Sequence, residues 1–179
     1  MNYKFLYILP VLFLATAAVY AASADPLLEL VYRGEPIAVQ NFLEQHAVKR
    51  ATLYKALNVA AGQCKVDTVK ALVNSKYKAE YDKPDTKLFV NTAYRNAIDE
   101  AKQVVSDAVS VRKNGYYDVS VSHGEGVHTE RRYVKTASEQ SAWAVKERDC
   151  SQVVTYLTEL ESARVIRNET KMAAKNANK

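Results

Sequence analysis

The sequence predicts a mainly α-helical fold of about four stacked helix pairs with one inserted β-hairpin. Glycine and proline are scarce, at 5 and 4 among 179 residues, and this composition favours helices over a β-sandwich. Apolar residues recur at helical spacing in several segments, and each segment has room for two short helices with a turn between them. Apolar and polar residues alternate in one stretch only, 116–135, where the alternation predicts two strands.

The first 24 residues have the pattern of a secretory signal peptide. Lys4 precedes an almost wholly apolar run from 5 to 22, and a cluster of small residues follows this run. Ala22-Ser23-Ala24 fits a cleavage site before Asp25, and cleavage after Ala21 is the alternative. An uncleaved membrane anchor fits less well, because no basic cluster follows the run. We therefore expect residues 1–24 to be removed and the protein to be periplasmic or secreted.

The mature chain of about 155 residues has the length of one ordinary domain. The formal net charge of the whole chain is +5, which is mild, and its basic residues are not gathered into one block. Nucleic acid is therefore not an expected partner. We expect a monomer that has no contact with a membrane beyond the signal peptide.

The first helix pair is predicted at the start of the mature chain. A short helical pattern over 27–33 ends at Gly34, and Pro36 begins a second pattern. Glycine after a helix and proline in the first turn of the next helix is the usual asymmetry of helix ends. The same kind of unit returns over 56–73, where Ala60 and Ala61 are small enough for two helices to approach closely.

Two further units are predicted in the second half of the chain. The third begins near Val90, and its helical pattern runs to Val109, or without a break to Val111. The fourth has a first helix over 141–150 and a second helix that begins near Val153. Between the second and third units, Asp82-Lys83-Pro84-Asp85 indicates a turn.

The central unit, 56–73, resembles an ankyrin repeat without a gap. The last unit, which contains Trp143, resembles a degenerate capping repeat of that family. Two departures are Asn58, where the family's repeat has histidine, and Cys64, where a glycine between the helices is usual. The residues that match apolar and small positions of the family's two helices are Leu57, Ala60, Ala61, Val69, Leu72 and Val73.

The resemblance implies an ankyrin-like domain over 25–161, with the hairpin at 115–136 as an extended finger between the third and fourth pairs. Another helix-pair array, such as a tetratricopeptide-like one, is the structural alternative. The remaining residues, 162–179, form a basic tail that is either helical or disordered.

The hairpin is the main candidate for binding a partner. Gly124-Glu125-Gly126 marks its turn, and tyrosine and arginine residues gather in its two strands. These two residue types dominate the energetics of protein–protein interfaces, although aromatic pairs also stabilise hairpins by packing across the strands. The candidate partner-binding residues are Tyr116, Tyr117, Arg131, Arg132 and Tyr133.

Residues with catalytic or metal-binding chemistry are few. No serine-hydrolase, zinc-protease or phosphate-loop motif occurs, so we expect neither an enzyme nor a cofactor. His123, Glu125 and His128 surround the hairpin turn and are weak candidates for a zinc or copper site. In an oxidising compartment Cys64 and Cys150 either form a disulfide or remain two buried thiols.

The expected function is that of an exported protein-binding module. Exported proteins of the ankyrin-like family include bacterial inhibitors that neutralise a toxic enzyme in the periplasm, and we expect such an immunity-type role for this chain. One alternative is an accessory protein that supports a periplasmic oxidative-stress enzyme. The other is a metal-binding or membrane-surface protein that uses the turn histidines or the basic tail.

Overall fold

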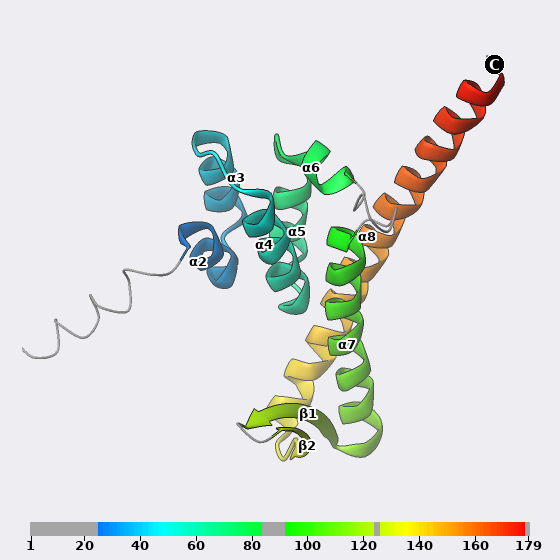
Figure 1. The fold of residues 1–179 in the computed structure, drawn as a ribbon. Coiled ribbons are helices and arrows are strands. Elements are labelled where there is room, and N and C mark those ends of the chain that lie inside the picture. The colour runs from blue at the N-terminus through cyan, green and yellow to red at the C-terminus, as the bar shows by residue number, and fades with distance from the viewer. Residues whose placement is uncertain (1–24, 84–91, 124–125, 178–179) are drawn as a thin grey trace, which may run out of the picture.

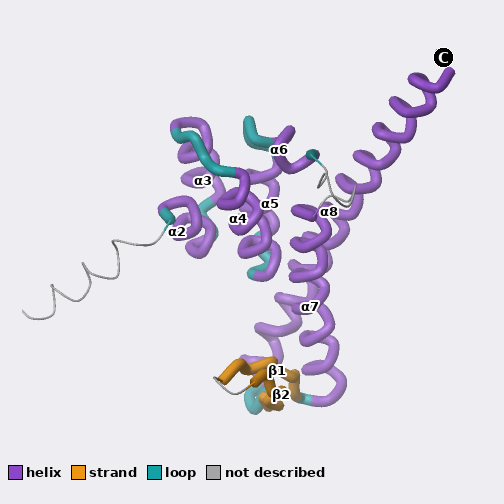
Figure 2. The backbone as a smooth tube through the Cα atoms, viewed as in Figure 1, coloured by secondary structure: helices purple, strands orange, loops and turns teal. Residues whose placement is uncertain are grey.

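The computed structural model describes residues 25–83, 92–123 and 126–177. In these residues the protein is mainly helical with one two-stranded antiparallel hairpin, as predicted (Figure 2). The predicted signal peptide, 1–24, lies outside the described residues. The elements are α2 (Pro26–Arg33), α3 (Pro36–Gln45), α4 (Arg50–Gly62), α5 (Val66–Val73), α6 (Lys78–Asp82), α7 (Thr92–Asn114), β1 (Tyr116–His123), β2 (Gly126–Tyr133) and α8 (Ala137–Ala177).

The helices pack as three neighbouring pairs. α2 and α3 form the first pair and α4 and α5 the second, with α2 against α4 and α3 against α5. The long helices α7 and α8 run antiparallel and continue the same order, α7 against α4 and α8 against α5 (Figure 1). The hairpin joins these two helices at one end, and α8 extends past the short helices at the other.

The first two pairs make the same turn between their helices. At the end of α2, the N–H groups of Gly34 and Glu35 donate to carbonyls of the last turn, at 3.0 and 3.2 Å. At the end of α4, Cys64 and Lys65 repeat both bonds at 3.0 Å. Gly34 has a φ of 72° and Cys64 a φ of 61°, so both turns place a residue in the left-handed region. Cys64 therefore occupies a position that glycine would adopt with less strain.

A disulfide connects the second helix pair to the third. Cys64 bonds to Cys150 of α8, with their Cα atoms 4.4 Å apart and a separation of 86 positions in sequence. Both residues are buried. Of the two alternatives that the sequence left open for these cysteines, the structure contains the disulfide.

The main core lies between the three pairs and stops partway along the third. It includes α7 as far as Val105 and α8 from Cys150 onward. We call the stretch between these points, residues 106–149, the arm, because its described residues lie outside the main core cluster. The largest fully buried aliphatic side chains of the core are Leu27, Val31, Val39, Leu43, Leu53, Leu57, Val69, Leu72, Val73 and Leu157.

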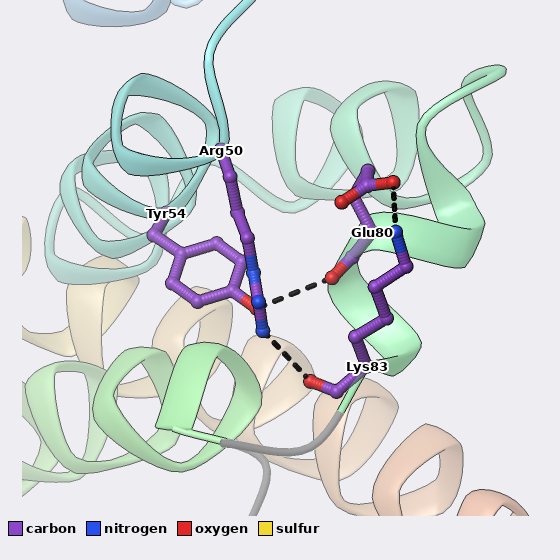
Figure 3. A network of polar contacts seen from close by, with 4 residues as sticks. All are labelled: Arg50, Tyr54, Glu80 and Lys83. Atoms are coloured by element: carbon purple, nitrogen blue, oxygen red, sulfur yellow. Dashed lines mark hydrogen bonds and ion pairs between the residues drawn. The ribbon is translucent and has the colours of Figure 1, made fainter. Parts of the chain in front are cut away.

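A polar network attaches α6 to the start of α4. The Arg50 Nε donates to the Tyr54 hydroxyl at 2.7 Å, and that hydroxyl donates to the Glu80 carbonyl at 3.2 Å (Figure 3). Arg50 also donates to the Lys83 carbonyl at 3.1 Å. These bonds satisfy carbonyls at the end of α6, a helix too short to be stable by itself.

Three tyrosine rings stack in a row from α4 through α6 to α7. The ring of Tyr81 lies between those of Tyr54 and Tyr94, at centroid distances of 6.2 and 6.4 Å. Burial raises the pKa of Tyr81 and of Tyr94, and the carboxylate of Asp82 raises that of Tyr94 further. Both hydroxyls therefore stay neutral at physiological pH, and the row serves packing.

A second set of polar contacts holds α8 near the end of the short helices. Asp82 accepts a hydrogen bond from the Tyr94 hydroxyl at 3.1 Å and pairs with Arg167 at 3.5 Å. The neighbouring Arg164 is buried and donates both Nε and a terminal nitrogen to Glu161, at 2.8 and 2.6 Å. α8 is thus attached here as well as at Cys150.

One prediction about the long helices was wrong, and an alternative that the sequence left open was confirmed. The fourth unit is not two helices that meet between Cys150 and Val153, because α8 continues through both and through residues 162–177 of the predicted tail. The third unit is one unbroken helix, α7, as the alternative for that unit predicted. α7 ends at Asn114, and Gly115 follows with a φ of 73°. Neither α7 nor α8 contains glycine or proline, so no residue inside them ends the helix. The hairpin consequently lies within the third pair, and a fourth pair is absent from the described residues.

We predict that the disulfide contributes strongly to stability. Cys64→Ala/Cys150→Ala should lower the free energy of unfolding by up to about 4–5 kcal/mol, because the bond closes a long loop in the unfolded chain. Urea unfolding followed by circular dichroism measures this. The matched variant Cys64→Gly/Cys150→Ala should lose about 1 kcal/mol less, since glycine adopts the left-handed conformation without strain. Equal stabilities of the two variants would contradict the turn geometry at Cys64.

Two glycines should respond to alanine in opposite directions. Gly34→Ala should lower the free energy of unfolding by about 1 kcal/mol or more, because φ is positive there and the new Cβ would lie 3.0 Å from the Lys65 side chain. Gly62→Ala should raise it by about 0.5–1 kcal/mol, because Gly62 is helical and its Cβ would make only an ordinary contact with Glu100 at 3.7 Å. Thermal midpoints that move in the same direction would refute this contrast.

Candidate functional site

The candidate site lies on the arm, where the hairpin meets the first turns of α8. β1 and β2 pair from Tyr116 opposite Tyr133 to His123 opposite Gly126. Because side chains alternate across a strand, Tyr116 and Tyr133 share one face of the hairpin, whereas Tyr117 and Arg132 share the other.

The first face of the hairpin is closed by its own contacts. The Tyr116 and Tyr133 rings meet edge to face at 5.7 Å, and the Arg131 guanidinium lies 4.1 Å above the Tyr116 ring. The Arg131 Nε donates to Asp118 at 3.2 Å, which together with Tyr116 raises the pKa of Arg131. Arg131 is therefore balanced by a carboxylate, while Tyr133 remains 63% exposed.

The second face attaches the hairpin to α8. The Tyr117 ring packs on the Trp143 ring at a centroid distance of 4.6 Å, and the Lys146 ammonium lies 4.4 Å from the Trp143 ring centroid. A two-stranded hairpin is at best marginally stable alone. The Tyr117–Trp143 contact therefore holds the hairpin against α8.

The start of α8 is capped where the hairpin ends. The Glu139 N–H donates to the Thr136 hydroxyl at 3.2 Å, and the Glu139 carboxylate accepts from the N–H groups of Lys135 and Thr136 at 2.9 and 3.0 Å. This reciprocal arrangement is a capping box. The backbone donors lower the pKa of Glu139, so its carboxylate is ionised and occupied by the helix start.

An open groove of about 480 Å³ lies between the end of β2 and α8. We call it the arm groove. Glu139 contributes its one carboxylate, and Val134 lines it as well. Its aromatic and basic lining residues are Tyr117, Tyr133, Trp143, Arg131, Arg132 and Lys135. A surface of this composition suits contact with another protein, because aromatic and arginine side chains are enriched in interface hot spots.

The five predicted partner-binding residues all lie on the arm but in different environments. Tyr116 and Arg131 are engaged within the hairpin, and Tyr117 anchors it to α8. Arg132 and Tyr133 are exposed. Trp143 and Lys135 belong to the same surface and were not among the predicted residues. That Trp143 is the only tryptophan of the chain, a short distance after a Tyr- and Arg-rich hairpin, was the available signal.

The candidate metal ligands are only partly described. Glu125 and the side chain of His123 lie outside the described residues. His128 is exposed, with its Nε2 3.3 Å from Glu130. The residues that the structure describes contain no group of three histidine, cysteine, aspartate or glutamate side chains arranged to hold a metal ion.

Comparison with protein-family models, with curated proteins and with solved structures finds no match for this chain. Within the described ranges, no helix combines the length and the apolar character needed to cross a bilayer.

We predict that Trp143→Ala frees the hairpin without unfolding the helix pairs. Loss of the Tyr117 contact removes an aromatic pair worth about 0.5–1.5 kcal/mol beyond its buried area. Amide hydrogen exchange in β1 and β2 should therefore accelerate several-fold, while exchange in α4 and α5 stays unchanged. Val145→Ala, on the same helix but 47% exposed, is the control and should leave the hairpin amides protected. Unchanged hairpin exchange in Trp143→Ala would show that other contacts hold it.

Proposed function

We propose that this protein is an exported protein-binding module that contacts its partner through the arm. The observation that carries the proposal is the separation between the arm and the core. The main core cluster stops at Val105 on α7 and resumes at Cys150 on α8, so the helix pairs do not need the hairpin for their packing. Yet the arm exposes Tyr133 and Arg132 beside an open groove.

Export is supported by two independent features. Residues 1–24 have the charge, apolar run and small residues of a signal peptide. The disulfide between Cys64 and Cys150 is of the kind that persists in the periplasm and outside the cell but is rare in the reducing cytosol.

We further propose that the helix pairs are ankyrin-like. The order in which the pairs pack, and the left-handed turn repeated at Gly34 and Cys64, support this. The turns are roughly 30 residues apart, close to the ankyrin period. In such arrays an insertion within a repeat extends as a loop on one face of the stack, which is often the binding face. The arm carries an insertion of this kind, the hairpin between the two helices of the third pair.

A binding role fits the arm better than a catalytic one. The groove is open, and of its titratable groups Glu139 caps α8 while Arg131 is paired with Asp118. We propose an immunity-type inhibitor that covers the site of a partner enzyme, because a protruding arm can enter a cleft. Support of a periplasmic oxidative-stress enzyme is the alternative role.

Capture from a cell-envelope extract of the source organism tests the proposal. The mature chain, residues 25–179, is compared with Tyr133→Ser and with Tyr32→Ser. Tyr32 is 56% exposed on α2, far from the arm in sequence, and is a matched control. Tyr133→Ser should weaken binding of a captured partner roughly thirtyfold or more, as expected for a hot-spot residue worth about 2 kcal/mol. Tyr32→Ser should leave it unchanged.

The affinity is measured with the purified partner by titration calorimetry. A partner that binds both variants as tightly as the wild type would remove the arm from the interface. Equal loss in both variants would indicate that the surface involves the first helix pair instead.

A further inference from the structure

The carboxylates of the arm are already engaged. Among the described arm residues, each aspartate and glutamate has a hydrogen-bond or ion-pair partner inside the protein. Asp107 accepts from Gln103, and Glu139 caps α8. The remaining pairs are Asp118 with Arg131, Glu130 with His128, Glu147 with Arg112, and Asp149 with Arg148.

Several cations of the arm have no such partner. Within the described residues no carboxylate lies in ion-pair distance of Lys113, Arg132, Lys135 or Lys146. Two of these, Arg132 and Lys135, line the arm groove, and Lys146 lies over the ring of Trp143. Among the residues that line the groove, the cations Arg131, Arg132 and Lys135 outnumber the one carboxylate, that of Glu139.

Aromatic rings lie beside these cations. Trp143 and Tyr117 line the groove, and Tyr133 contributes an exposed ring. A peptide that alternates carboxylate and apolar side chains would match both features, since the guanidinium of Arg132 donates in a planar fork that fits a carboxylate. The two cations come from different places, β2 and the link to α8, so they suit separate carboxylates along one segment.

We propose that the arm groove binds an exposed acidic peptide segment, with its carboxylates at Arg132 and Lys135 and an apolar side chain against Trp143. This inference rests on the proposed function, because it names the chemistry of the partner that the arm contacts. A polyphosphate or a lipid surface fits less well, because the ionised Glu139 carboxylate lines the same groove and would repel a dense negative charge.

Trp143 makes the proposal directly measurable. It is the only tryptophan of the chain, so tryptophan fluorescence reports on the groove alone. The mature disulfide-bonded protein is titrated with a twelve-residue peptide of Glu and Leu that lacks aromatic residues. A peptide with every Glu replaced by Gln is the matched probe. The Glu peptide should change the fluorescence saturably. Raising the salt concentration from about 50 to about 300 mM should weaken binding of the peptide, because salt screens exposed charges.

Two double variants distinguish an effect of the groove cations from a general effect of the protein's positive charge. Arg132→Gln/Lys135→Gln should weaken binding of the Glu peptide about tenfold or more, as expected for lost hydrogen bonds to charged groups. Lys102→Gln/Lys175→Gln removes two exposed cations outside the arm and should leave the affinity unchanged. Equal binding of the Gln peptide, equal loss in both variants, or no saturable change up to about 1 mM peptide would each overturn the inference.

The charge-reversal variant Arg132→Glu/Lys135→Glu distinguishes this inference from the proposed function. If both Tyr133→Ser and the charge reversal abolish binding of the partner, the result supports the inference that the partner presents an acidic segment. If Tyr133→Ser abolishes binding of the partner but the charge reversal does not, the result supports an interface on the arm and overturns the inference of an acidic segment. Groove-dependent binding to phosphatidylglycerol vesicles without binding to the Glu peptide also overturns it.

Discussion

The contact between the second and third helix pairs holds the two long helices, and with them the arm, against the short helices. α7 packs on α4 and α8 on α5, and the Cys64–Cys150 disulfide makes this contact covalent. One of the two bonded residues, Cys64, lies in a turn and has a left-handed backbone conformation, which is unfavourable for cysteine. The disulfide joins two helix pairs through residues 86 positions apart in sequence. The free energy gained by restricting the unfolded chain exceeds the free energy that one unfavourable backbone angle costs. The bond thereby adds to the packing of α8 on α5 in holding this long helix to the short pairs.

The attachment of α8 at two places explains how it can extend in both directions. Cys150 holds its middle, and the contacts of Asp82 with Tyr94 and Arg167 hold it near α6. Beyond the second attachment the helix continues away from the body (Figure 1). Before the first one lies the arm, which depends on contacts of its own: the capping box at Glu139 and the packing of Tyr117 on Trp143. The arm can therefore change its surface without disturbing the core.

Chemically similar residues of the arm lie in different environments. Neighbouring arginines in β2 differ completely: Arg131 is paired with Asp118 and covers Tyr116, whereas Arg132 on the opposite face has no carboxylate partner among the described residues. Strand alternation alone produces this difference, since a shift of one residue moves a side chain to the other face. Tyr116 and Tyr117 are divided in the same way, one packing within the hairpin and the other on α8.

The sequence by itself determined the local elements of this protein. Gly34 and Pro36 marked the first pair, and alternation marked the hairpin, because both signals act within a few residues. The number of pairs was not determined in this way. Apolar spacing shows which side of a helix is buried but does not show whether one helix continues into the next. The prediction therefore placed two helices where the structure has the single helix α8. Only the tertiary structure decided that Cys64 and Cys150 meet, and that Trp143 lies beside Tyr117 and Arg132. Such contacts join segments that are distant in sequence, and their geometry depends on how the helices pack.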